Sequence, residues 1–208
     1  MSKYKSDFIG VKASGISHLT DARYFAARGV KWMGFDTAVQ GSMEQDIHRV
    51  MAIKEWIDGV RLIGEFKHQE VPEILHWVRE TDLDGIQINN SFPVGDIIQL
   101  PKGLFTIVHI VSPIFTDSQA LNNQFKEFES IADCFLIEVN EENINNRELK
   151  ALSVNFPILY EWNAPTELLP PFFKEISSYG ISLRGSNEEK IGFKSYEELD
   201  EIFEELAI

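Results

Sequence analysis

The 208-residue chain has a single cysteine, few basic residues and no long apolar run. The lone Cys134 excludes an internal disulfide and a cysteine-rich zinc site. With 19 Lys and Arg against 33 Asp and Glu, the net charge of −14 argues against nucleic acid and anionic membranes as partners. No stretch reaches the roughly 18 apolar residues of a membrane span, and residues 1–7 do not resemble a signal peptide. We therefore expect a soluble, cytoplasmic protein.

The residues that are present have the composition of a folded domain, with 44% hydrophobic and 12% aromatic side chains. A chain of this length can bury one sizeable core. We expect one domain over residues 1–208, because no linker or low-complexity segment interrupts it. Cys134, Trp56 and Trp77 are expected in its core.

Strand-like apolar runs alternate with amphipathic, helix-like runs along the chain. The predicted strands are Phe8–Ala13, Lys31–Phe35, Val60–Phe66, Asp84–Ile88, Leu104–Ile110, Asp133–Val139, Phe156–Glu161 and Tyr179–Arg184. The predicted helices are Leu19–Arg28, Met43–Ile57, Val71–Glu80, Val94–Gln99, Asp117–Ile131, Ile144–Ser153, a segment after Pro165, and Ser195–Leu206, with Asp117 and Ser195 as N-caps. Such alternation implies parallel strands joined by right-handed crossovers. The sequence therefore predicts an α/β fold, a (β/α)8 TIM barrel, with a doubly wound open sheet as the alternative.

Polar side chains stand at or just after the carboxyl ends of all the predicted strands, where a barrel of this kind places its functional residues. They are Lys12, Ser14, Asp36, Glu65, Gln87, Asn89, His109, Glu138, Glu161, Arg184 and Ser186. Lys12 and Ser14 are two residues apart, so both point to the same face of the first strand. Chains that leave a sheet commonly become polar for solvation alone. The pattern predicts a polar mouth without naming its chemistry.

The carboxylates in this set, Asp36, Glu65, Glu138 and Glu161, leave a metal-assisted reaction open as one hypothesis. Oxygen ligands of this kind suit Mg²⁺, Ca²⁺ or Mn²⁺. The sequence carries no metal-ligand spacing motif, and our expectation is that the site uses neither a metal nor a cofactor.

The segment Lys12-Ala13-Ser14-Gly15-Ile16-Ser17, followed by Asp21-Ala22, resembles the Lys-x-Cys-Gly-Ile-Thr and Asp-Ala motifs of the phosphoribosylanthranilate isomerase family. Other segments are similar to further motifs of that family, in register along the chain: Trp32–Phe35, Leu62–Phe66, Leu83–Ile88, Pro157–Leu159 and Gly192–Lys194. The resemblance implies a cytoplasmic, cofactor-free barrel of tryptophan biosynthesis, either a monomer or a homodimer. Its implied reaction is the Amadori aldose–ketose isomerisation of N-(5-phosphoribosyl)anthranilate, a small anionic phosphosugar.

The resemblance also implies roles for individual residues. Ser14 stands where the family has its cysteine general base, and Glu138 where it has its aspartate general acid. A serine hydroxyl is a far weaker acid than a thiol and needs its own activating base, so His109 is the alternative base. The implied substrate- and phosphate-binding residues are Lys12, Gln87, Arg184, Gly185 and Ser186.

The loops that hold the substrate in that family differ here. Residues 36–42 contain no arginine, where the family uses one to hold the anthranilate carboxylate. The glycine-containing loops after strands six, seven and eight are replaced by residues 140–146, 161–163 and 183–185. A second class of function therefore stays open: a diverged, non-catalytic paralogue that binds another small anion or a protein partner.

Overall fold

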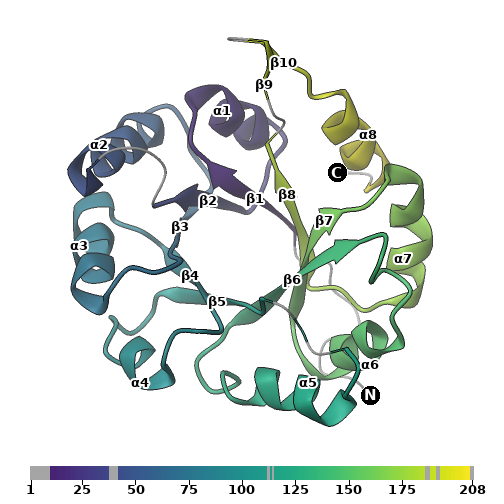
Figure 1. Ribbon diagram of the computed structural model, residues 1–208. Helices are drawn as coiled ribbons and strands as arrows, with labels where there is room; N and C mark the ends of the chain where they lie inside the picture. The colour runs from purple at the N-terminus through teal and green to yellow at the C-terminus, as the bar shows by residue number, and fades with distance from the viewer. Residues whose placement is uncertain are drawn as a thin grey trace.

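In a computed structural model, eight parallel strands close into a barrel in the order β1 to β8 (Figure 1). The structure describes residues 10–37, 42–111, 113, 115–185, 188–190 and 193–206. The strands are β1 (Gly10–Ile16), β2 (Trp32–Asp36), β3 (Arg61–Glu65), β4 (Gly85–Asn89), β5 (Phe105–His109), β6 (Cys134–Asn140), β7 (Ile158–Asn163) and β8 (Gly180–Arg184). The predicted (β/α)8 barrel is confirmed, and the open sheet is excluded because β8 pairs with β1.

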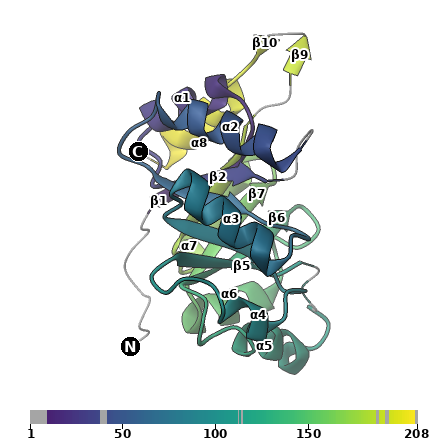
Figure 2. The same cartoon turned by 90° about the vertical axis from the view of Figure 1, so that its left-hand side faces the viewer.

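Helices surround the barrel on its outside (Figures 1 and 2). They are α1 (Leu19–Ala27), α2 (Met43–Lys54), α3 (Val71–Thr81), α4 (Val94–Ile97), α5 (Ser118–Lys126), α6 (Arg147–Asn155), the 3-10 turn η1 (Thr166–Leu168), α7 (Leu169–Glu175) and α8 (Glu197–Glu205). None of the helices in the described ranges is both long and apolar enough to cross a membrane.

A short antiparallel hairpin of β9 (Glu188–Lys190) and β10 (Phe193–Lys194) projects beyond the barrel between β8 and α8 (Figure 2). The sequence did not predict it. Strands of two and three residues are too short to show the alternation of apolar and polar residues by which strands are recognised.

The starts of α5 and α8 can be compared with the N-caps that the sequence predicted for them. Asp117 caps α5, since its Oδ1 accepts the backbone N–H of Gln119 at 2.9 Å and of Ala120 at 3.1 Å. The predicted cap at Ser195 is wrong, because Tyr196 occupies the N-cap of α8. The Ser195 hydroxyl still accepts the backbone N–H of Glu197, at 3.4 Å, which explains why the sequence pattern suggested it.

The last helix is fixed to the first by a polar and aromatic contact that completes the ring of helices. Tyr24 of α1 stacks on Tyr196 with their ring centroids 4.1 Å apart. The Tyr24 hydroxyl donates to Asp200 of α8 at 2.6 Å, and the Tyr196 hydroxyl donates to Asp21 at 2.7 Å. These contacts hold α8 against α1.

Apolar side chains fill the lower part of the barrel, away from the carboxyl ends of the strands. This inner cluster consists of Trp32, Ile63, Ile107, Cys134, Leu136 and Leu159. Cys134 and Trp77 are buried as predicted. The prediction for Trp56 is wrong: it is 65% exposed, because α2 ends at Lys54 and no longer turns this residue toward the barrel.

Candidate active site at the barrel mouth

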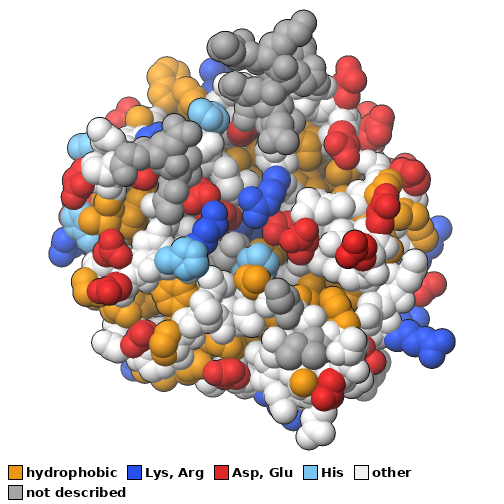
Figure 3. All heavy atoms as spheres, viewed as in Figure 1, with side chains coloured by type: hydrophobic (Ala, Val, Ile, Leu, Met, Phe, Trp, Pro, Cys, Tyr) orange, Lys and Arg blue, Asp and Glu red, His pale blue; other side chains and the backbone are white. Residues whose placement is uncertain are grey.

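The strand register brings the predicted polar residues to one end of the barrel. Around the ring, neighbouring strands pair Lys12 with Ser182, Ser14 with Arg184, Asp36 with Glu65, Glu65 with Gln87, Asn89 with His109, and Glu138 with Glu161. Gly185 follows β8 and is partly buried, and Ser186 lies outside the described residues. In the view of Figure 3, Lys, Arg and His side chains gather at the centre of the face with Asp and Glu side chains beside them.

Below the opening, Lys12 is fully buried and forms an ion pair with the buried carboxylate of Glu65. Its ammonium also donates to Oγ of Ser14 at 2.6 Å. Ser14 in turn shares a hydrogen bond with Ser182 of β8 at 2.6 Å. Because the oxygen of Ser14 already accepts a hydrogen bond from a cation, the hydroxyl is poorly placed to remove a proton from a substrate. Lys12 itself has no exposed surface with which to meet an anion.

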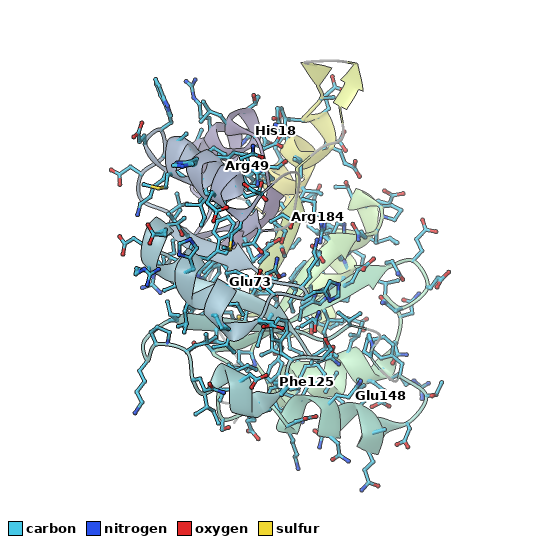
Figure 4. All side chains as sticks on the ribbon, turned by 60° about the vertical axis from the view of Figure 1, so that its left-hand side comes forward. His18, Arg49, Glu73, Phe125, Glu148 and Arg184 are labelled. Atoms are coloured by element: carbon cyan, nitrogen blue, oxygen red, sulfur yellow. The ribbon has the colours of Figure 1, made fainter. Side chains whose placement is uncertain are left out.

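Arg184 extends from β8 toward β7 (Figure 4), where its Nε donates to Oε1 of Glu161 at 2.8 Å. The arginine side chain is 49% exposed, whereas that of Glu161 is 2% exposed. Burial opposes the charge of Arg184, but Glu161, Glu65 and Glu138 outweigh burial and raise its pKa, so it stays protonated. Within the described residues, the two Nη groups of Arg184 form no hydrogen bond, which leaves them available for an anion.

Glu138 is exposed at the end of β6. Its Oε1 accepts a hydrogen bond from Nδ2 of Asn163, on the neighbouring strand β7, at 2.9 Å. Nδ2 of Asn143 donates to the backbone carbonyl of Glu138 at 2.9 Å. The sequence did not predict these two supporting amides, although Asn163 lies two residues beyond Glu161 and therefore on the same face of the strand.

His109 ends β5, between Asn89 of β4 and Leu136 of β6. Burial lowers the pKa of this imidazole. Glu161 and Glu65 act in the opposite direction, while Lys12 and Arg184 add to the lowering. A lowered pKa keeps the ring neutral at pH 7, the form that can accept a proton. His109 is thus the strand-end residue with the chemistry of a general base.

Two further residues complete the mouth. Gln87 of β4 is 8% exposed, and its buried Oε1 has no hydrogen-bond partner among the described residues, which is unusual for a buried acceptor. Asp36 of β2 forms an ion pair of 2.9 Å with Lys67. The sequence did not single out Lys67, which follows the predicted third strand by one residue.

Three of the described carboxylates at the mouth are paired with cations. Within the parts of the chain that the structure describes, no group of three or more His, Cys, Asp or Glu side chains could hold a metal ion. Glu65, Glu161 and Asp36 face Lys12, Arg184 and Lys67 instead. The metal-assisted hypothesis finds no support in this geometry.

A groove of about 960 Å³ opens beside Arg184, between the ends of β7 and β8 and helix α8. Arg184 is the only basic residue among those described along its walls, which also carry Glu167, Glu197, Glu198 and Glu201. The first turn of α8 is acidic, so the positive end of the helix dipole there is already compensated. An anion in this groove would depend on Arg184.

No family model matches the chain. A curated phosphoribosylanthranilate isomerase of Chlamydia felis (strain Fe/C-56) is 26% identical over 104 residues, which are 49% of this chain and 50% of that protein. The chain resembles phosphoribosylanthranilate isomerases. The match spans about half the length of the curated relatives.

Solved phosphoribosylanthranilate isomerases share the fold across almost the whole chain. The enzyme of Thermus thermophilus has a TM-score of 0.74 at 22% identity, covering 96% of this chain and 98% of that one. An isomerase in complex with reduced 1-(o-carboxyphenylamino)-1-deoxyribulose 5-phosphate has a TM-score of 0.74 at 14% identity, with the same coverage. At these identities the structural likeness shows the fold alone.

Proposed function

We propose that this chain is a phosphoribosylanthranilate isomerase-like enzyme that carries out an Amadori aldose–ketose isomerisation at the barrel mouth. The observation that carries the proposal is the pair His109 and Glu138, a neutral imidazole and an exposed carboxyl group at the ends of the neighbouring strands β5 and β6. This reaction needs one group to protonate the ring oxygen of the sugar and another to remove the proton from C2.

In this proposal Glu138, in its protonated form, gives its proton to the ring oxygen, and the sugar opens. Asn163 holds the carboxyl group in place through Oε1. Ring opening leaves a protonated imine at C1, and His109 then removes the C2 proton to give an enolamine. The enolamine becomes the ketone when C1 takes a proton back from His109 and the C2 hydroxyl gives its proton to the Glu138 carboxylate, which restores both groups. Ser14 does not act as the base, because its oxygen is engaged by Lys12.

Substrate binding is assigned to groups that face the opening. Arg184 receives the phosphate through its Nη groups, beside the Gly185 backbone. Gln87 is assigned to a sugar hydroxyl, which its buried and unpartnered Oε1 would meet once the side chain turns toward the opening. The solved relative that holds a reduced deoxyribulose 5-phosphate derivative supports a phosphosugar as the ligand class.

The test is turnover of freshly prepared N-(5-phosphoribosyl)anthranilate by the purified protein. We expect His109→Gln and Glu138→Gln each to lower kcat by about 100-fold or more, as for the loss of a general acid or base. His48→Gln and Glu129→Gln are the matched controls, since both residues are exposed and lie away from the mouth, on α2 and just after α5. Absence of turnover in the wild-type protein would refute the proposal.

A second candidate is a non-catalytic barrel that binds another small anion or a protein partner. The ion pair between Glu161 and Arg184 favours it, because a buried carboxylate occupies the cation that a phosphate would need. Growth of a strain lacking this isomerase when it expresses the chain would exclude the second candidate. Failure to grow, together with tight binding of inorganic phosphate to the purified protein, would favour it.

A further inference from the structure

Glu65 and Lys12 form their ion pair across an intervening strand. Glu65 belongs to β3 and Lys12 to β1, and β2 lies between them in the closed barrel. The residue of β2 at this point is Gly34. A Cβ on Gly34 would overlap Oε1 of Glu65 and lie 2.7 Å from Nζ of Lys12. The missing side chain of Gly34 is therefore what makes room for the ion pair inside the barrel.

The second oxygen of Glu65 holds the turn that follows β1. Its Oε2 accepts the backbone N–H of Gly15 at 3.1 Å. Gly15 has a φ of +67°, in the left-handed region that favours glycine, and a Cβ there would lie 3.4 Å from Nη1 of Arg184. One carboxylate thus fixes both the lysine of β1 and the turn against which the exposed arginine rests.

Stability alone does not account for this arrangement. The two side chains are almost completely removed from water, and the cost of desolvating them offsets much of their attraction. Replacing a buried ion pair by apolar residues of similar volume is often neutral or stabilising. What an apolar pair cannot do is bind the Gly15 amide and the Ser14 hydroxyl at the same time.

We propose that Glu65 is a positioning residue of the mouth, which holds Lys12, Ser14 and the turn at Gly15 in one arrangement beneath the substrate. The catalytic part of this inference rests on the proposed isomerase function. Glu65 touches no part of the opening itself, since it is buried, and it acts through Lys12 and the backbone of Gly15.

The deciding variant is the double substitution Lys12→Met and Glu65→Leu, which replaces the ion pair by apolar side chains. We expect its melting temperature to stay close to that of the wild-type protein, while kcat falls at least tenfold and KM changes little. A double variant with both the wild-type melting temperature and the wild-type kcat would overturn the proposal, because the pair would then be needed for packing only.

A second measurement does not depend on activity. Hydrogen exchange of the Gly15 amide reports its bond to Glu65, and we expect faster exchange in the double variant and in Gly34→Ala, whose new methyl group displaces the carboxylate. Gly95→Ala is the matched control, because a Cβ there meets no atom within 4 Å. If the wild-type protein shows no turnover, the proposed function fails, but this exchange still decides the inference. An unchanged Gly15 exchange rate in both variants would overturn it.

Discussion

Nε of Arg184 lies 2.8 Å from Oε1 of Glu161, so the one basic side chain described in the groove is held by a buried carboxylate before any ligand arrives. The hydrogen bond uses the Nε edge of the guanidinium and fixes the direction in which the two Nη groups point. Anion affinity at this mouth therefore depends on the balance between Glu161 and the incoming ligand.

Replacing Glu161 by Gln should strengthen anion binding. The variant keeps the shape and a hydrogen-bond acceptor but removes the negative charge, and we expect the Kd for inorganic phosphate to fall about tenfold, which corresponds to about 1.4 kcal/mol. Isothermal titration calorimetry measures the change. The control is Glu167→Gln, an exposed residue of the same groove that forms no ion pair with Arg184. Equal affinities in Glu161→Gln and the wild-type protein would contradict this prediction.

Replacing Ser14 by Cys should raise turnover. Nζ of Lys12 lies 2.6 Å from the side-chain oxygen of residue 14, and a neighbouring ammonium lowers a thiol pKa, which favours the thiolate. Burial acts against this effect, as it does at Cys134, where it raises the thiol pKa. We expect the close cation to dominate, so that a thiolate at position 14, unlike the serine hydroxyl, adds a second base to His109 and raises kcat at least tenfold. Ser182→Cys, at the other end of the same hydrogen bond, is the control, and an equal gain there would argue against a base at position 14.

The pH dependence should follow His109. Its pKa in the folded protein lies below the ordinary value of 6.5, chiefly because of burial. The acid limb of kcat/KM is therefore expected below pH 6.5, and NMR titration of the imidazole should give the same midpoint. Glu161, Glu65, Lys12 and Arg184 are the charged groups that act on this ring. An acid limb that persists in His109→Gln would assign it to another group.

The same group contributes to stability with a definite sign. On acidification the unfolded chain protonates His109 near pH 6.5, while the folded protein keeps the ring neutral to lower pH. The free energy of unfolding therefore falls as the pH drops from 6.5 to the folded-state pKa, and below that pKa this group causes no further loss. His109→Gln should flatten that part of the curve in urea unfolding measured at several pH values.

The free energy of unfolding should be sensitive to substitution of Phe125, which lies in the core between the barrel and the helices. Its ring centroid lies 4.7 Å from that of Phe135 and 5.0 Å from that of Phe156, which ties α5 to the barrel (Figure 4). We expect Phe125→Ala to lower the free energy of unfolding by about 3–5 kcal/mol. Val154→Ala, at a residue 48% exposed, should change it by about 0.5 kcal/mol or less. Urea unfolding followed by circular dichroism compares the two.

The barrel and the positions of its strand ends could be predicted from the sequence, because both depend on local information. Short apolar runs that alternate with amphipathic ones specify parallel strands and crossovers. The polar residue at the end of each apolar run then lies at the mouth of the barrel, whatever residues it contacts there. Asp36, His109 and Glu138 were placed there on this ground alone.

The partners of these residues could not be predicted, because they depend on contacts across the barrel. Lys12 and Glu65 are 53 residues apart in the chain and two strands apart in the ring. Their contact depends on the absence of a side chain at Gly34, which the sequence pattern gave no reason to notice. The family resemblance implied that Lys12 and Arg184 bind the substrate, and the structure pairs each of them with a buried carboxylate.

The space at Gly34 also determines the order in which substitutions at positions 34 and 65 can be accepted. A side chain at position 34 overlaps the Glu65 carboxylate, so a substitution there requires residue 65 either to move aside or to become shorter. The reverse order is open, since a smaller residue 65 leaves Gly34 undisturbed. A library that varies both positions should therefore yield large residues at position 34 only together with small ones at position 65. If an ancestor had an apolar residue at position 65, it would have needed glycine at position 34 before it could acquire Glu65.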